Sequence, residues 1–218
     1  MSNRITNAQV LEAVIELQSK IKERKFQQSI ELQIGLKDYD PQKDKRFVGT
    51  VRLPNCPREN LKICIIADEK HKEENKKNPL TNVDFTDLDT LKKFNKDKKV
   101  IKKWAKKYAL LMASDTVLKK VPAVVGPILN RIGKFPTPVT HQIPLQTTIG
   151  DTRSSVKFQL KKVTCLAQCV GHEKMEQDDL RQNIMMSINF LVSLLKKGWH
   201  NIKSVHIKAT MSPSIKLL

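Results

Sequence analysis

The sequence predicts a mixed α/β and α+β protein of two domains, in which an α/β/α domain is inserted into a split α+β domain built from both chain ends. Three patterns support this prediction. Residues 29–34 alternate between polar and apolar side chains, as expected of a strand with one buried face. Residues 63–67 and 109–113 are short apolar runs, typical of strands buried on both faces of a parallel sheet. The alternating pattern returns after Gly150.

The chain begins with a predicted helix and an amphipathic strand. Thr6 and Gln9 have the spacing of a capping box, and apolar residues recur at helical spacing as far as Arg24. The strand at residues 25–35 follows. Its buried face is apolar, and its other face carries a row of hydrogen-bonding groups, Ser29, Glu31 and Gln33. Such a face can meet a polar partner along its length.

A second strand is predicted at residues 47–53 and ends at Pro54. Gly49 within it indicates either a bulge or a close approach of the backbone to another segment.

Helices and buried strands then alternate from residue 68 to about residue 151. The predicted helices are residues 69–78, 87–94, 100–108 and 114–120. This alternation predicts a parallel sheet covered on both faces, as in Rossmann-like domains. The many lysines of these helices are most simply a solvated face. Residues 121–138 are rich in Gly and Pro and are expected to form tight turns.

After residue 153 the sequence predicts two strands, 155–161 and 162–171, as antiparallel neighbours. A helix starts at Asp178 and Asp179, whose charges suit its N-terminus, and Gly198 ends it. The remaining predicted elements are a strand at 204–209, a turn at 210–213 and a short closing strand.

These elements set the predicted domain boundaries. We assign residues 1–66 and 153–218 to the split domain and residues 67–152 to the insert, with a hinge where the chain passes twice between them.

The charge of the chain indicates an anionic partner. The 40 Lys and Arg residues exceed the 22 Asp and Glu residues and give a net charge of +18. Apolar runs are too short to span a membrane, and residues 1–5 lack the apolar core of a signal peptide. The four cysteines show no zinc-site spacing and are expected to be buried free thiols, although a disulfide between distant cysteines stays open.

Four stretches of sequence, in matching order, resemble the ribosomal protein L-one family of the mobile stalk beside the tRNA exit site. They are KFxxSIEL at 25–32, VGTVxLP at 48–54, GPxLNxxGKFP at 126–136 and TMxP at 210–213. Residues 88–96 and 189–197 resemble the eukaryotic cytosolic branch in particular. The resemblance extends over essentially the whole chain.

The resemblance implies a structural constituent of the large ribosomal subunit in the cytoplasm. Its split domain would bind the ribosomal RNA junction of the stalk, and the protein would assist release of deacylated tRNA. The implied partners are large-subunit ribosomal RNA, exit-site tRNA and other ribosomal components, with no cofactor, metal, membrane or small-molecule substrate.

The predicted RNA-binding residues come from both ends of the chain. They are Lys25, Phe26, Ser29, Glu31, Arg52, Lys161, Lys162, His172, Thr210, Met211 and Ser212. In the insert, Arg131 and Lys134 are expected to face RNA or tRNA, with a purely structural loop as the alternative. Ionised Glu31 can only accept hydrogen bonds, so it must meet 2′-hydroxyl or base N–H donors, whereas lysines neutralise phosphate.

The sequence departs from the family pattern at two of these positions. His172 stands where the family commonly has Lys after Val-Gly, and Ser212 stands where it usually has Gly. Because Pro213 favours an extended residue before it, we expect a non-positive φ at Ser212 and a hydroxyl free to bond RNA.

The sequence also bears on two other function classes. A nucleotide-dependent enzyme would need a phosphate-binding motif, and neither GxGxxG nor GxxxxGK[ST] occurs. A ribosome-assembly factor or messenger-RNA-binding regulator of the same fold stays open on sequence alone.

Overall fold

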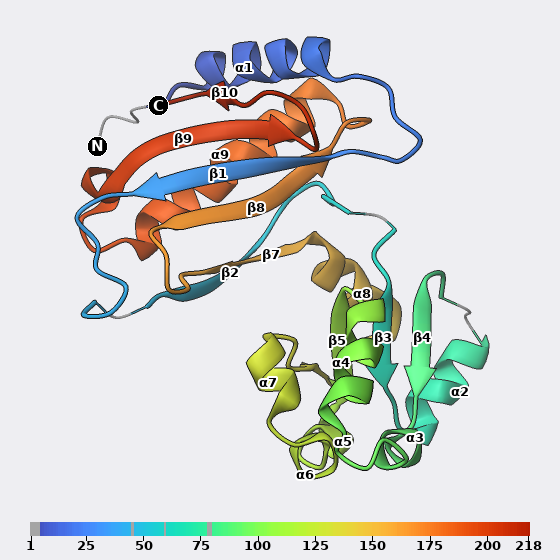
Figure 1. Cartoon of the computed structure of the whole chain (residues 1–218). Helices are drawn as coiled ribbons and strands as arrows, with labels where there is room; N and C mark the ends of the chain where they lie inside the picture. Colours follow the sequence, from blue (N-terminus) through green and yellow to red (C-terminus); the bar gives the residue numbers. More distant parts are fainter. Residues whose placement is uncertain (1–4, 45, 59, 78–79) are drawn as a thin grey trace. The chain divides into compact units, whose positions relative to one another are not determined.

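The computed structural model describes residues 5–44, 46–58, 60–77 and 80–218. The chain forms two compact units (Figure 1). Unit 1 consists of Met1–Glu59 and Thr152–Leu218, and unit 2 consists of Asn60–Asp151. The mixed α/β fold predicted from the sequence is confirmed, because a parallel sheet in unit 2 is inserted between the two chain segments that build the antiparallel sheet of unit 1.

Unit 1 contains a four-stranded antiparallel sheet in the order β10-β9-β1-β8 (Figure 1). Its strands are β1 (Ser29–Leu36), β8 (Cys165–His172), β9 (Ile202–Ala209) and β10 (Ile215–Lys216). Helices α1 (Asn7–Lys20) and α9 (Gln177–Leu194) pack together with the apolar face of this sheet in one core. Two central strands therefore come from opposite ends of the sequence.

The two helices of unit 1 follow from local sequence. The capping box at α1 is formed, since the Thr6 hydroxyl accepts from the Gln9 N–H and the Gln9 side chain accepts from the Thr6 N–H. Helix α9 has the predicted acidic first turn, but it ends earlier than expected, with Leu195 as its C-cap. Gly198, with a φ of 53°, instead begins the 3-10 helix η1 (Gly198–Asn201).

A separate two-stranded ribbon joins β2 (Val48–Arg52) to β7 (Ser155–Gln159). The expected antiparallel pairing of the two strands after residue 153 is wrong, because β7 pairs with β2 whereas β8 pairs with β1. Gly49 marks a close approach and not a bulge. The β2–β7 register is regular, and a Cβ at Gly49 would lie 2.8 Å from Leu194 Cδ1 and 2.9 Å from Phe190 Cζ.

Unit 2 is built on a four-stranded parallel sheet in the order β4-β3-β5-β6. Its strands are β3 (Ile63–Ile66), β4 (Val83–Thr86), β5 (Leu110–Ser114) and β6 (Thr137–Val139). Apolar clusters lie on both faces of this sheet, which is why β3 is buried at every position. Strand β3 belongs to this unit, although the boundary expected at residue 67 would have left it in the other.

The helices of unit 2 are mostly short. They are α2 (Glu69–Lys77), α3 (Leu88–Lys92), α4 (Lys98–Lys107), α5 (Asp115–Leu118), α6 (Val121–Val125), α7 (Ile128–Ile132) and most of α8 (Leu145–Ser154), whose residues from Thr152 on belong to unit 1. The Gly- and Pro-rich segment forms α6 and α7 and then β6. Gly126 separates the two helices with a φ of 70°, and Gly133 ends α7 in the left-handed region at 79°. No helix among the described residues has the length and apolar character needed to cross a bilayer.

Candidate RNA-binding surface

The open face of the unit 1 sheet carries the predicted row of polar side chains. Burial along β1 alternates at every residue, with Ser29, Glu31 and Gln33 partly exposed and their neighbours buried. The adjoining strand contributes a second row, because Lys208 of β9 pairs with Glu31 and His206 pairs with Gln33. Polar groups from both ends of the chain therefore form one surface, which we call the open face.

The start of β1 is joined to the turn near the C-terminus. The Thr210 N–H donates to the Ser29 carbonyl oxygen at 3.1 Å, and the Thr210 hydroxyl donates to the same oxygen at 3.2 Å. The hydroxyls of Ser29 and Thr210 also lie 3.2 Å apart. His172 of β8 lies opposite Ser29 on the other side. Three predicted residues thus meet at one end of the open face, which we call the junction end.

Ser212 differs from its prediction in one respect. Its φ is not positive, as expected, and the left-handed residue of the turn is Met211, with a φ of 64°. Its hydroxyl is not free, however. The Ser212 Oγ accepts from the Ala209 N–H at 3.1 Å and lies 3.2 Å from the Ala209 carbonyl oxygen, and the residue is buried. The hydroxyl stabilises the turn because it satisfies backbone groups that the strand end leaves unpaired.

Two apolar side chains near the junction end are unusually exposed. Phe26 is 50% exposed and Met211 is 71% exposed. The segment before β1 is held in place by Gln28, which is buried and donates to the Lys22 carbonyl oxygen at 2.7 Å. Phe26 and the exposed Lys25 thus lie on an anchored segment, where both side chains are accessible to a partner.

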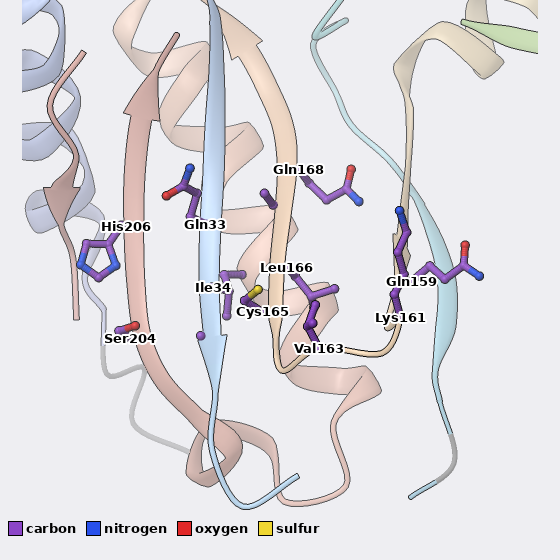
Figure 2. A pocket seen from close by; sticks show the side chains of 12 residues that line it. Gln33, Ile34, Gln159, Lys161, Val163, Cys165, Leu166, Gln168, Ser204 and His206 are labelled. Atoms are coloured by element: carbon purple, nitrogen blue, oxygen red, sulfur yellow. The ribbon is translucent and has the colours of Figure 1, made fainter. Parts of the chain in front are cut away.

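The opposite end of the open face is hollowed (Figure 2). A hollow of about 620 Å³ is lined by Gln33, Lys161, Cys165, Ser204 and His206, together with neighbouring residues. Figure 2 shows these side chains along β1, β8, β9 and the β7–β8 connection. Lys161 therefore lies at the hollow and not at the junction end.

The four cysteines are free, but Cys165 is exposed and Cys56 is partly exposed, so the expectation of buried thiols holds only for Cys64 and Cys169. Both Cys165 and Cys169 lie on the open face, opposite Gly35 and Glu31 of β1. Within the described part of the chain, no cluster of His, Cys, Asp and Glu side chains could hold a metal ion.

Two further predicted residues are separate from these groups. Arg52 is exposed at the end of β2, opposite Ser155 in the two-stranded ribbon. Lys162 is exposed in the β7–β8 connection. The predicted set therefore divides into the junction end, the hollow with its connection, and the ribbon.

Comparison with known proteins identifies the family. Residues 17–213 match the model of the Ribosomal protein L1p/L10e family. The chain belongs to this family. The large ribosomal subunit protein uL1 of Oryza sativa subsp. japonica is 52% identical over 92% of this chain and 91% of its own length. Proteins of that name from Drosophila melanogaster and, as uL1A, Saccharomyces cerevisiae are 48% and 50% identical over essentially full length.

The Gly-Pro motif of unit 2 contains the two predicted contact residues of this unit, Arg131 and Lys134. Arg131 is exposed on α7, but Lys134 is half-buried, and its ammonium donates to the carbonyl oxygens of Ala105, at 3.0 Å, and Tyr108. These carbonyls are at the C-terminal end of α4, so Lys134 caps that helix. Burial lowers the pKa of Lys134 below its usual value. Lys134 therefore has the internal contacts expected of a structural loop, and its contact with RNA stays a prediction.

Sequence reasoning missed Lys208 and His206, which extend the open face beside Glu31 and Gln33. The signal that could have found them is the alternation of β9, which has the same period as that of β1. Pairing the two alternating strands would have placed both polar rows on one face.

Proposed function

We propose that the chain is a structural constituent of the large subunit of cytoplasmic ribosomes, and that its open face binds the ribosomal RNA junction of the mobile stalk next to the tRNA exit site. Family membership and the names of the relatives support this proposal. The observation that carries the RNA-binding part is the hydrogen bonding of Thr210 to Ser29, because it brings two distant motifs into one surface. No catalytic role is proposed.

The chemistry of the junction end suits folded RNA. The hydroxyls of Ser29 and Thr210 can both donate and accept, which matches the 2′-hydroxyl that distinguishes RNA from DNA. Glu31 accepts from 2′-hydroxyl or base N–H donors, while Lys208 beside it can contact phosphate. Phe26 supplies an exposed ring on which a base or sugar can pack. This mixture of hydroxyl, acidic, basic and aromatic groups favours an RNA of matching shape over one that matches in charge alone.

We further propose that units 1 and 2 are two domains that move relative to each other as exit-site tRNA leaves. The chain crosses between them only twice, and such connections commonly serve as hinges. Arg131 on the exposed side of α7 would contact RNA or tRNA. Fluorescent labels on the two units would report a single fixed distance across ribosome states if this motion does not occur.

Competition binding tests the proposed function. A folded stalk-junction RNA should displace a labelled copy of itself far better than a duplex of equal length does. With roughly six phosphate contacts, affinity should fall about a thousandfold between 50 and 200 mM salt. Equal competition by both RNAs would contradict specific recognition. Loss of the protein from mature large subunits in high salt would favour an assembly factor instead.

A further inference from the structure

Helix α4 of unit 2 has one half of its surface covered by lysines. The helix packs into the core through Ile101 and Ala105, which are buried, and Trp104, which is partly exposed. At 3.6 residues per turn, its remaining polar positions occupy the opposite half of the circumference. All six are exposed lysines, which we call the lysine face: Lys98, Lys99, Lys102, Lys103, Lys106 and Lys107.

No acidic side chain among the described residues forms a salt bridge with the lysine face. Asp97 precedes the helix, but its carboxylate accepts from the Lys99 N–H as the N-cap. Other helices do pair their cations, as with Lys20 and Glu16 of α1 or Arg181 and Asp178 of α9. Within the described part of the chain, the positive charge of α4 is therefore not balanced by ion pairs.

This arrangement opposes the stability of the helix. Lysines four residues apart repel each other, and the sequence of α4 contains four such pairs. Lys98 and Lys99 also lie at the N-terminus, where the helix dipole disfavours cations. A face that served solubility alone would carry both signs of charge. A ten-residue helix with this repulsion needs stabilisation from outside itself. Hydrogen bonds at both ends of α4 provide it, from Asp97 at the N-terminus and from Lys134 at the C-terminus.

We propose that the lysine face of α4 binds the phosphate backbone of double-stranded RNA without reading its sequence. Successive lysines in a row are about 6 Å apart along the axis, which presents a linear series of point charges to a linear polyanion. The one aromatic side chain within α4, Trp104, packs against both Phe94 and Tyr108 and is therefore not a free stacking platform for single strands. The surface lies in unit 2 and is distinct from the open face.

The test uses the full chain and two variants of equal charge. Lys102→Gln/Lys106→Gln removes two lysines of one row, and Lys119→Gln/Lys120→Gln removes two exposed lysines of unit 2 outside α4. Binding of a fluorescent mixed-sequence RNA duplex is measured by anisotropy at 50 and 200 mM salt. Each lost phosphate contact reduces the slope of log K against log salt by about 0.9, taking the value for duplex DNA. The salt-dependent rise in Kd should therefore shrink about 12-fold in the α4 variant.

The control variant decides whether position matters. Its salt-dependent rise in Kd should stay within about twofold of the unmodified chain. An equal change in both variants would overturn the proposal, because net charge alone would then explain binding. An unchanged slope in the α4 variant would overturn it as well. Competition by polyglutamate as strong as that by duplex RNA would point to an acidic protein instead.

Thermal unfolding shows whether a variant loses binding only because it is less stable. Removing Lys102 and Lys106 relieves repulsion within α4, so the Tm of that variant should be equal to or above that of the unmodified chain. Weaker binding by a variant that is at least as stable supports a contact surface. The specific competition by stalk-junction RNA depends on unit 1, so it should survive in the α4 variant, and this separates failure of the inference from failure of the proposed function.

Discussion

The open face of unit 1 and the lysine face of unit 2 present polar groups in opposite ways. On the open face the groups are mixed in kind and connected to one another: Ser29 and Thr210 share hydrogen bonds, and Glu31 lies opposite Lys208. On α4 the groups are identical, and within the described chain they have no salt-bridge partner. One surface is fixed in geometry and the other concentrates charge.

This difference separates two tasks of an RNA-binding protein. Groups held in place by hydrogen bonds cost little entropy to order on binding and can reject a partner of the wrong shape. Lysines on a helix attract any polyanion and lose their effect in salt. We therefore expect specificity to depend on unit 1 and a salt-dependent part of the affinity to depend on α4.

The largest expected effect concerns the packing of α9 against β8 beside the junction end. Gly171 pairs with Ile30 of β1, and a Cβ there would lie 2.4 Å from Leu180 Cδ2 and 2.8 Å from Met175 Sδ. Gly171→Val should lower the free energy of unfolding by about 3 kcal/mol through overpacking. Gly150→Ala is the matched control, since its Cβ meets nothing within 4 Å and Ala favours a helix. Urea unfolding measures both, and similar losses would contradict the packing argument.

The second prediction concerns the charged acceptor of the open face. Glu31→Ala should weaken binding of stalk-junction RNA by about 2 kcal/mol, roughly 30-fold, because hydrogen bonds to charged groups are the stronger ones. Glu31→Gln keeps one acceptor oxygen and should lose less. Filter binding of the two variants measures the difference. A gain in affinity on removing this negative charge would mean that Glu31 merely repels phosphate.

Much of this surface could be predicted from sequence because its determinants are local. The alternation of β1 predicted which face is open, and the pattern of β9 contained the second row. Long-range pairings could not be predicted in this way. Lys134 donates to the carbonyl oxygen of Tyr108, 26 residues earlier in the chain, and so caps α4. The Ser212 hydroxyl bonds Ala209, only three residues away, but this contact depends on the shape of a turn in which Met211 is left-handed. Neither of these internal partners is indicated by a local sequence pattern.

The two edge strands of the parallel sheet, unlike the short closing strand β10, were not predicted from sequence. Strand β6 has three residues and contains Pro138, which is tolerated there because β6 is an edge strand. Strand β4 lies at the other edge and is only four residues long. In both cases the strand forms because it pairs with a buried neighbour in the parallel sheet, and not because its own residues strongly favour a strand. The buried strands β3 and β5 of the same sheet were predictable from their continuous apolar runs.

A smaller effect is expected where the two ends of the chain join. Thr210→Val keeps the shape of the side chain but removes the hydroxyl that bonds the Ser29 carbonyl oxygen. The free energy of unfolding should fall by about 1 kcal/mol. Thr50→Val on the exposed side of β2 is the control and should change it by less than about 0.5 kcal/mol. If thermal unfolding ranks the two equally, the Thr210 hydroxyl does not help to hold the junction end.

The smallest expected effect is an increase in the stability of the fold. Lys102→Gln/Lys106→Gln removes two of the four like-charge pairs four residues apart in α4, so its free energy of unfolding should rise by about 0.5 kcal/mol at low salt. The gain should disappear at high salt because screening already weakens the repulsion. Urea unfolding at two salt concentrations measures it. A loss of stability at low salt would show that these lysines are structural.

The most direct test of the separation between the two surfaces is a specificity ratio, the Kd for a random duplex divided by the Kd for the stalk-junction RNA, measured at one salt concentration. Glu31→Ala should lower this ratio by about 30-fold, since only the folded junction uses the acceptor. Lys102→Gln/Lys106→Gln should weaken both RNAs together and leave the ratio within about threefold of its original value. A ratio that collapses in the lysine variant and persists in the Glu31 variant would contradict the account.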